Sequence, residues 1–455
     1  MSISNEQTDI LVIGGGPAAM VFVSTSLENY PDKKVTVVKI EQVGQVPCGI
    51  PYIFGTTLGD SEKNAMSCGG PMAQMVDIKV DTVTKVDFAT KTAYTNNHAI
   101  TYDKLIFATG SIPFVHKNFE HTLSYDNVFT ISKYKEEIDR IKDYIEDKKN
   151  IIVIGTGFIG VEMATELRSV GKNVTIVGGR HILANSFDEE LAIEAEDIMK
   201  DMGINLSLGQ HAQDVIENNN IASGIKLCDD TIIEGDAIIL ATGYKPNTTL
   251  AEEAGLSDTM YGGIWVDEYM KTTQKDVFAI GDCSGRRDSI TRNPSKVMLA
   301  STSAAEARVA ANSLYGLQYL KGFSGTIAIF STMIGNRAFA SAGVTETQAK
   351  KENIDYVVGS FEAMNRHPST IPDASKQAIK LVALRSSGQI IGGQIVGDKE
   401  AGEIINIIGL TIEAKLTAHH LISLQVATQP VLTPAPTMYP LIKAAQKILL
   451  NKKSR

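Results

Sequence analysis

Short runs of aliphatic residues recur along the chain, and several of them pass directly into glycine-rich stretches. The first run, Asp9–Ile13, leads into Gly14–Ala19, and the mixed apolar and polar residues at 19–30 then predict a helix. The apolar run Val35–Val38 follows. Apolar strands on either side of a helix are typical of a parallel strand–helix–strand unit.

The same order of elements returns near the middle of the chain. The apolar run Asn150–Ile154 is followed by Gly155–Gly160, a predicted helix at 161–171 and the apolar run Asn173–Val177. Two such units predict an α/β chain with two related parallel sheets.

Three later apolar runs are expected to close these units. Two of them end in Ala-Thr-Gly, which places Ala108, Thr109, Gly110, Ala241, Thr242 and Gly243 at strand ends. The third ends in Gly281 and Asp282. Beyond these runs the hydrophobic pattern predicts two strands and two helices, at Gly325–Phe330, at Ala378–Leu384, from Ala401 and from Tyr439.

Glycine spacing gives the two turns a chemical meaning. Gly14 permits a tight turn, Gly16 lets backbone amides approach a pyrophosphate, and Ala19 is small enough for helix and strand to pack closely. The helix N-terminus supplies amide donors for the phosphates. One such turn also closes ordinary loops, but two turns between a strand and a helix favour two dinucleotide sites. The expected contacts are Gly14, Gly16, Pro17, Ala18, Ala19, Gly155, Gly157, Phe158, Ile159 and Gly160.

Composition narrows the class of protein. A chain of 455 residues is expected to form two or three domains, and 43% hydrophobic with 21% charged residues is typical of globular proteins. The net charge of -9 disfavours nucleic acid and anionic membrane surfaces as partners. No apolar run is long enough to span a bilayer, and we expect no secretory signal.

The cysteines point to a reducing compartment. Cys48, Cys68, Cys228 and Cys283 are too few for a structural disulfide framework in a chain of this length. We therefore expect a cytoplasmic protein in which any cysteine chemistry is catalytic. No metal site is expected, because no CxxC or HExxH pattern is present.

On these motifs the whole chain resembles the pyridine nucleotide-disulfide oxidoreductases. The resemblance implies two Rossmann-like domains, one for FAD and one for NAD(P), and a C-terminal α+β dimerisation domain that forms a homodimer and reaches toward the partner's flavin. It implies that Asp282, after Gly281, binds the ribityl chain of FAD. The expected boundaries are 1–113 and 246–324 for the FAD domain, 114–245 for the NAD(P) domain and 325–455 for the dimerisation domain.

Cys48 lies in the string Cys48-Gly49-Ile50-Pro51-Tyr52, shortly after the first unit. Most lone cysteines are small buried apolar residues, but this string is similar to that of the single-cysteine members of the family. These are coenzyme A disulfide reductases, NADH oxidases and NAD(P)H-dependent sulfur or polysulfide reductases. We expect Cys48 at the start of a helix or turn beside the flavin, where a helix N-terminus favours the thiolate. Cys68 is either a resolving thiol or an ordinary loop residue.

The chain departs from its relatives at several positions. The acid expected at the end of the second strand is displaced, so Glu41 is the candidate contact for the adenosine ribose. After Val177 no acid is available and Arg180 follows, which favours NADPH over NADH, although a solvated surface arginine is the alternative. Glu162 matches a family position beside the nicotinamide, or is an exposed helix residue.

Further candidates come from the resemblance alone. Tyr439, in a proline-rich string, is a candidate proton donor or a packed core tyrosine. A helix beginning near 295–299, with Leu299 and Ala300 at the flavin, is expected to aim its positive end at the ring. Pro17 stands where peroxidase relatives place a histidine, which disfavours peroxide chemistry.

The resulting functional expectation is an FAD-dependent NAD(P)H oxidoreductase. It passes electrons from NAD(P)H through the flavin and Cys48 to a small disulfide, persulfide, polysulfide or coenzyme A-type substrate. The alternatives are an NADH oxidase that reduces oxygen, an electron-transfer reductase for a protein such as rubredoxin, and a non-enzymatic FAD-binding protein.

Overall fold

The computed structural model describes residues 4–66, 75–260, 262–316 and 322–453. Two compact units are each built from three chain segments. Unit 1 contains Met1–Glu120, Phe129–Asp147 and Thr242–Thr326, and unit 2 contains His121–Val128, Lys148–Ala241 and Ile327–Arg455.

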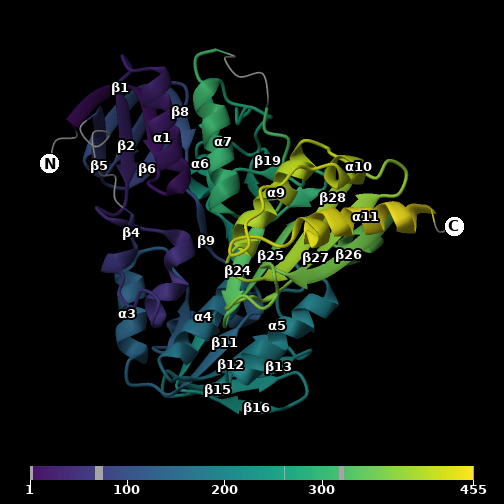
Figure 1. Ribbon diagram of the computed structural model, residues 1–455. Helices are drawn as coiled ribbons and strands as arrows, with labels where there is room; N and C mark the ends of the chain where they lie inside the picture. Colours follow the sequence, from purple (N-terminus) through teal and green to yellow (C-terminus); the bar gives the residue numbers. More distant parts are fainter. Residues whose placement is uncertain (1–3, 67–74, 261, 317–321, 454–455) are drawn as a thin grey trace. The chain divides into compact units, whose positions relative to one another are not determined.

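A largely parallel sheet forms the centre of unit 1, with strand order β5-β2-β1-β8-β7-β6 and β21 beside β8. Strand β1 lies between β2 and β8 and pairs in parallel with both. Helices α1 and α7 lie side by side (Figure 1). The bounds are β1 Ser4–Ile13, α1 Pro17–Asn29, β2 Val35–Lys39, β5 Val76–Val80, β6 Val83–Asp87, β7 Thr92–Thr95, β8 His98–Phe107, α3 Lys135–Ile145, α6 Thr249–Glu253, β21 Val277–Ala279 and α7 Ala300–Asn312.

Burial explains why the first apolar run forms a central strand. Ile10, Leu11 and Val12 are completely buried, as is Phe22 of α1. Every residue at the carboxyl end of β1 faces protein on both sides, as parallel sheets require. Pro17 at the first position of α1 fits because a helix start needs no backbone N–H donor.

Unit 2 contains a second parallel sheet, in which neighbouring strands follow the order β17-β11-β12-β13. A small antiparallel sheet, β14-β15-β16, follows it in the chain. The bounds are β11 Asn150–Ile154, α4 Phe158–Ser169, β12 Asn173–Gly178, α5 Glu189–Asp201, β13 Asn205–Leu208, β14 Ala212–Asn218, β15 Ile221–Leu227, β16 Ile232–Glu234 and β17 Ala237–Leu240.

The C-terminal part of unit 2 is an antiparallel sheet of order β24-β25-β28-β27-β26 with helices packed against it (Figure 1). Helix α9 contacts β25 and β28, and α11 contacts β26 and β27. The bounds are β24 Phe330–Ile334, β25 Arg337–Gly343, α8 Glu346–Lys351, β26 Tyr356–Met364, β27 Lys376–Leu384, β28 Ile390–Gly397, α9 Ala401–Glu413, α10 Ala418–Ile422 and α11 Pro440–Lys453.

Short elements complete the description: β3 Gly44–Gln45, η1 Pro47–Gly49, η2 Pro51–Phe54, η3 Glu62–Asn64, β4 Ala65–Met66, β9 Ser111–Pro113, η4 Lys117–Ser124, β10 Val128–Thr130, β18 Tyr244–Pro246, β19 Thr259–Met260, β20 Gly263–Ile264, η5 Gly281–Cys283, β22 Arg286–Arg287, β23 Pro294–Ser295 and η6 Pro436–Met438.

The predicted fold class is confirmed, because each unit contains a largely parallel sheet and the C-terminal part of unit 2 is an antiparallel sheet with helices. The strand predicted at Gly325–Phe330 is wrong. Gly325 and Ala328 have φ of +111° and +57°, which interrupts extended backbone, and the strand begins only at Phe330.

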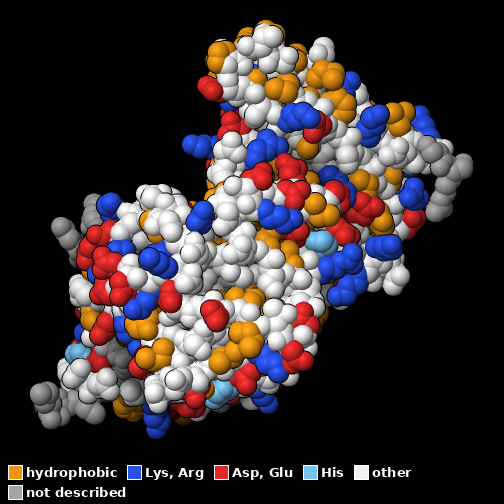
Figure 2. All heavy atoms as spheres, turned by 90° about the horizontal axis from the view of Figure 1, so that it is seen from below, with side chains coloured by type: hydrophobic (Ala, Val, Ile, Leu, Met, Phe, Trp, Pro, Cys, Tyr) orange, Lys and Arg blue, Asp and Glu red, His pale blue; other side chains and the backbone are white. Residues whose placement is uncertain are grey.

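The surface carries both signs of charge. On the face shown in Figure 2, Lys and Arg side chains are interspersed with Asp and Glu side chains. Among the described residues no helix combines the length and the apolar character needed to cross a membrane.

Candidate active site

The first glycine-rich turn joins β1 to α1 in unit 1. Gly14 has φ of +119°, and a methyl group in place of its hydrogen would lie 2.1 Å from the Ala108 carbonyl oxygen. Only glycine fits there. A methyl group on Gly16, the N-cap of α1, would meet no atom within 4 Å. The turn is therefore tight on one side and open at the helix N-terminus, as a pyrophosphate site requires.

Asp282 follows Gly281 after β21, and its Oδ1 accepts a hydrogen bond from Ser303 Oγ at 3.4 Å. Its Oδ2 accepts hydrogen bonds from Ser111 Oγ at 2.9 Å and Lys133 Nζ at 3.1 Å. Burial works to raise the pKa of Asp282, but Lys133 and Arg286 outweigh burial and hold the pKa below its usual value. Ser111 and Lys133 were not predicted, because no local motif surrounds them.

A buried ion pair lies behind this turn. Arg286 Nη2 and Glu306 Oε2 are 3.1 Å apart, with side chains 4% and 1% exposed. Glu306 also accepts the Gly281 backbone N–H at 2.9 Å, and Arg286 donates to the Gly281 carbonyl. Burial raises the pKa of Glu306 to about 6, although Arg286 opposes the shift. The pair fixes the peptide groups that present Asp282, and no local sequence motif indicates it.

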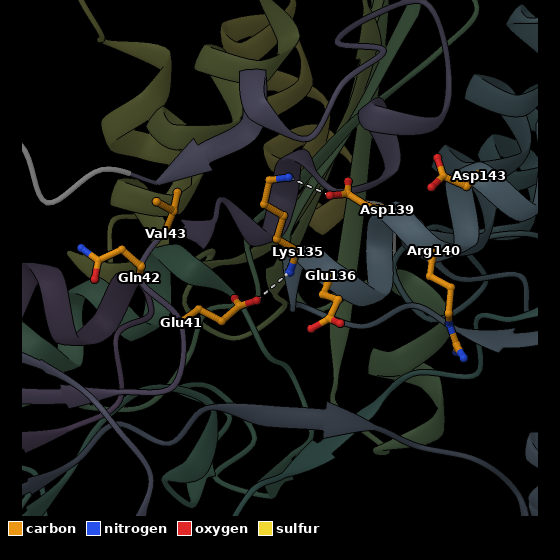
Figure 3. Close-up of a pocket in the computed structure, with 8 residues that line it drawn as sticks. All are labelled: Glu41, Gln42, Val43, Lys135, Glu136, Asp139, Arg140 and Asp143. Carbon is orange, nitrogen blue, oxygen red and sulfur yellow. Dashed lines mark hydrogen bonds and ion pairs between the residues drawn. The ribbon is translucent and has the colours of Figure 1, made fainter. Parts of the chain in front are cut away.

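Glu41 lies beyond the end of β2 and faces helix α3 (Figure 3). Its Oε1 accepts the backbone N–H of Lys135, the first residue of that helix, at 2.9 Å. Burial raises the pKa of Glu41. The carboxylate borders a cavity of about 720 Å³ lined by Glu41, Gln42, Val43, Lys135, Glu136, Asp139, Arg140 and Asp143. Its contact with a ribose stays a prediction.

Cys48 is exposed and lies in the single 3₁₀ turn η1. A turn of three residues has too few aligned peptides for a helix macrodipole, so the expected effect of a helix N-terminus on the thiolate loses its basis. Gly44, near the start of this segment, lies beside the first glycine turn, since a methyl group there would be 4.0 Å from the Gly15 carbonyl oxygen. Cys68 lies outside the described residues.

The two other cysteines differ in their surroundings. Cys283 is fully buried, with its sulfur 3.4 Å from the Phe107 carbonyl oxygen, and burial raises the pKa of its thiol. Cys228 is exposed after β15. Cys283 therefore packs as a core residue.

The second glycine-rich turn, in unit 2, repeats the geometry of the first. Gly155 has φ of +130°, and a methyl group on Gly160 would lie 2.1 Å from the Gly155 carbonyl oxygen. A methyl group on Gly157 would meet nothing within 4 Å. Phe158, the first residue of α4, stacks on Phe330 with ring centroids 4.9 Å apart. This turn also combines tight packing with an open helix start.

The loop after β12 carries alternating charges. Arg180, 80% exposed, donates to Glu189 at 3.1 Å, and Glu189 also contacts His181 at 3.2 Å. The second ring nitrogen of His181 lies 3.0 Å from buried Glu196. Arg180 is therefore a solvent-exposed arginine, as the alternative to a phosphate contact predicts. It also forms an ion pair with Glu189, which was not predicted from the sequence.

Glu162 is not the exposed helix residue of the alternative reading. It is partly buried on α4 and accepts a hydrogen bond from Thr332 Oγ1 of β24 at 2.9 Å. Burial raises its pKa to about 7. A carboxyl that titrates near neutrality is a recurrent feature of functional sites.

Within unit 1, hydrogen bonds join the segments that follow the two Ala-Thr-Gly motifs. Thr109 Oγ1 donates to the Asn247 carbonyl at 2.6 Å and Thr242 Oγ1 to the Phe114 carbonyl at 2.5 Å. Gly110 and Gly243 have φ of +69° and +103°. Ala108 borders Gly14 in unit 1, whereas Ala241 lies in unit 2, where a methyl group on Gly160 would be 3.6 Å from the Ala241 Cβ.

The helix expected near 295–299 begins at Ala300, with Leu299 as its extended N-cap. The earlier residues pair as β22 and β23 instead, because Pro294 and Ser295 face Arg287 and Arg286. Tyr439 follows η6 in unit 2, partly buried, and burial raises its pKa.

Two glycine-turn nucleotide folds and a C-terminal sheet define a dinucleotide-dependent oxidoreductase. The chain matches the model of the pyridine nucleotide-disulphide oxidoreductases over residues 8–307 and that of their dimerisation domain over 329–439. It therefore belongs to the pyridine nucleotide-disulphide oxidoreductases, and the predicted family is confirmed. Membership supports binding of FAD and of a nicotinamide dinucleotide.

The proteins that this chain resembles include a sulfur reductase and an NADH oxidase. The chain is 30% identical to an NAD(P)H coenzyme A polysulfide/persulfide reductase of Pyrococcus horikoshii, covering 86% of this chain and 88% of that protein. It is 27% identical to an NADH oxidase of Enterococcus faecalis, covering 90% and 93%. A structure of reduced CoADR-RHD from Bacillus anthracis has a TM-score of 0.91 at 26% identity, covering 98% of this chain and 81% of that one.

Proposed function

We propose that this chain is an FAD-dependent NAD(P)H oxidoreductase that reduces a low-molecular-weight disulfide, persulfide or polysulfide through Cys48. The observation that carries the proposal is the exposed Cys48 in η1, four residues after Gly44, which lies beside the first glycine turn. The name of the P. horikoshii relative, and that of an NAD-dependent persulfide reductase from A. fulgidus of known structure, 27% identical, support sulfur acceptors.

Residues of unit 1 would hold FAD. The amides at the start of α1 would bind the pyrophosphate through the open face of Gly16, and Asp282 would accept hydroxyl donors of the ribityl chain. Lys133 and Ser111 orient the Asp282 carboxylate. Bound FAD supplies a two-electron carrier between the nicotinamide and the sulfur centre.

Residues of unit 2 would hold the nicotinamide dinucleotide. The open helix start at Gly157 suits its pyrophosphate. Arg180, with no acid at Gly178 or Gly179, favours the 2′-phosphate of NADPH.

Cys48 performs the sulfur step. Its thiolate attacks one sulfur of the disulfide, a bond to Cys48 forms, the original sulfur–sulfur bond breaks and the first thiolate leaves. Two electrons that originate from NAD(P)H then cleave the mixed disulfide, which releases the second thiolate and restores Cys48. Tyr439, in the segment that matches the dimerisation domain, is the proposed proton donor to the leaving thiolate, and burial raises the pKa of its hydroxyl, which makes it a weaker acid than a free tyrosine.

The Cys48→Ser variant tests the proposal. We expect the purified variant to retain its yellow colour and its reduction by NAD(P)H under nitrogen, but to lose at least 100-fold in turnover with polysulfide or coenzyme A disulfide, because serine cannot form a mixed disulfide. Cys228→Ser, which also removes an exposed thiol, serves as the control. Undiminished sulfur reduction in Cys48→Ser would remove Cys48 from the mechanism.

The second candidate function is an NADH oxidase that reduces oxygen, favoured by relatives of that name from Enterococcus faecalis and Streptococcus pyogenes. Rapid NAD(P)H consumption in air without a sulfur acceptor, against slow turnover with polysulfide under nitrogen, would select it. We further propose a homodimer, supported by the dimerisation-domain match, and a cytoplasmic location, supported by the small number of cysteines.

A further inference from the structure

Two buried amide side chains lie under the turn that carries Cys48. Gln45 of β3 is 3% exposed and Asn64 of η3 is 4% exposed. Asn64 Nδ2 donates to Gln45 Oε1 at 3.1 Å and to the Val46 carbonyl at 3.0 Å. The Val46 backbone N–H donates in turn to the Asn64 carbonyl at 3.0 Å. Val46, which directly precedes the turn, is therefore held on both of its peptide groups by one residue.

Asn64 also contacts the residue that follows Cys48. A methyl group on Gly49 would lie 1.9 Å from Asn64 Oδ1 and 2.9 Å from its Cγ. Gly49 does not adopt the left-handed backbone that reserves a position for glycine. A side chain at position 49 is therefore prevented by the position of Asn64 and not by the backbone conformation of Gly49. Asn64 thus packs directly against the peptide after Cys48.

The cost of burying these amides argues for a directional role. A buried polar group without a partner costs about 1–3 kcal/mol, and Gln45 Nε2 finds no hydrogen-bond partner among the described residues. An aliphatic side chain would fill the same space without that cost. Buried polar contacts of this kind fix one arrangement of the backbone where apolar packing permits several.

We propose that Asn64 is the positioning residue of Cys48, holding the turn from both sides, and that Gly49 is required because Asn64 occupies its side-chain space. The inference rests on the proposed role of Cys48 and adds the residue that sets where its sulfur lies. Gln45 in turn fixes the orientation of the Asn64 amide. Positioning to within about 0.5 Å matters because attack on a disulfide needs an aligned thiolate.

The test compares two activities of the same FAD-loaded enzyme. Reduction of polysulfide requires Cys48, whereas reduction of ferricyanide by NAD(P)H requires only the cofactors. We expect Asn64→Leu to lower the ratio of polysulfide to ferricyanide turnover at least tenfold, in kcat and not in the KM for NAD(P)H. Asn29→Leu, which removes the amide–amide hydrogen bond to Asn312 in the same unit, is the matched control.

A double-mutant cycle tests the contact itself. Gly49→Ala alone is expected to lower the same ratio at least tenfold because its methyl group meets Asn64, and adding Asn64→Ala is expected to cause no further loss. Additive losses, or an unchanged ratio in folded, yellow Asn64→Leu, would overturn the inference. Such a result leaves the proposed function standing if Cys48→Ser is inactive with polysulfide, so the two failures are distinguishable.

Discussion

At the scale of single residues, Arg180 in the loop after β12 already forms an ion pair with Glu189. Arg180 and Glu189 are 80% and 55% exposed and 3.1 Å apart, and an exposed pair of this kind contributes at most about 1 kcal/mol. A 2′-phosphate would bring more charge to Arg180 than one carboxylate does. With NADPH bound as proposed, Glu189 would compete with the 2′-phosphate for Arg180 and would also repel that phosphate.

This competition predicts opposite effects of two substitutions. We expect Glu189→Gln to lower the KM for NADPH about threefold and Arg180→Gln to raise it about tenfold, with the KM for NADH changed less than about twofold by either. Asp197→Asn, which breaks the exposed pair with Lys200 on the same helix, controls for a change of charge on α5. Steady-state kinetics with both dinucleotides give the answer, and equal shifts for NADH would contradict it.

At the scale of elements, the Gly281–Asp282 turn depends on the ion pair behind it. Removing one member of a buried pair leaves the other charge uncompensated and costs about 3–5 kcal/mol. Replacing both members by apolar side chains avoids that cost. Removal of one residue therefore leaves an unpaired buried charge, whereas joint removal leaves no charge but takes away the hydrogen-bond partners of the Gly281 N–H and carbonyl.

We expect Glu306→Gln to lower the melting temperature and the FAD content of the purified protein, because Arg286 loses its charge partner while the Gly281 N–H keeps an acceptor. Glu306→Leu combined with Arg286→Met is expected to lose less stability than the sum of the losses caused by the two single changes. Thermal unfolding and flavin absorbance measure both, with exposed Glu253→Gln as control. A double variant as unstable as the sum of the single ones would contradict this account.

Some of these elements can be predicted from the sequence, whereas the contacts between distant residues cannot. Both glycine turns, their strands and helices, and the place of Asp282 follow from motifs contained within a few residues. Ser111 and Asp282 are 171 residues apart in the chain, and Lys133 and Asp282 are 149 apart, so no window of sequence contains their contact. The strand predicted from Gly325 is wrong for a different reason. The pattern of apolar residues does not reveal the positive φ of Ala328.

At the scale of the whole molecule, a cluster of charged residues joins the nucleotide-binding part of unit 2 to the C-terminal sheet. The cluster consists of Lys380, Asp188, Glu190 and Glu346. Lys380 of β27 contacts Asp188 at 2.9 Å and Glu346 at 2.8 Å, and also reaches Glu190 at the start of α5. Asp188 is 2% exposed. Burial works to raise the pKa of Asp188, but hydrogen bonds from Thr347 and Lys380 lower it below its usual value.

The cluster predicts how stability depends on pH. Because the folded-state pKa of Asp188 is lowered, its contribution is present above the unfolded pKa of about 4 and is lost as pH falls through the folded value. We expect Lys380→Met to cost about 3 kcal/mol at pH 7 and to move the acid-induced loss to higher pH. Melting temperatures between pH 3 and pH 7 measure both effects.

Lys376→Met is the matched control for this experiment. Lys376 lies on the same strand but is 69% exposed and pairs with exposed Glu362. We expect its melting curve to follow that of the unsubstituted protein at every pH. Equal destabilisation by both substitutions would mean that the buried cluster has no special role.

The threading of the chain has a consequence for its synthesis. Strand β21 and Asp282 reach the first sheet only after the chain has left unit 1 and returned to it. A ribosome must therefore translate most of the message before the edge of β8 is covered, and until then the nascent apolar strand is open to mispairing or to chaperones. Messages truncated near codon 240 should yield colourless, aggregating polypeptide rather than a small flavin-loaded fragment.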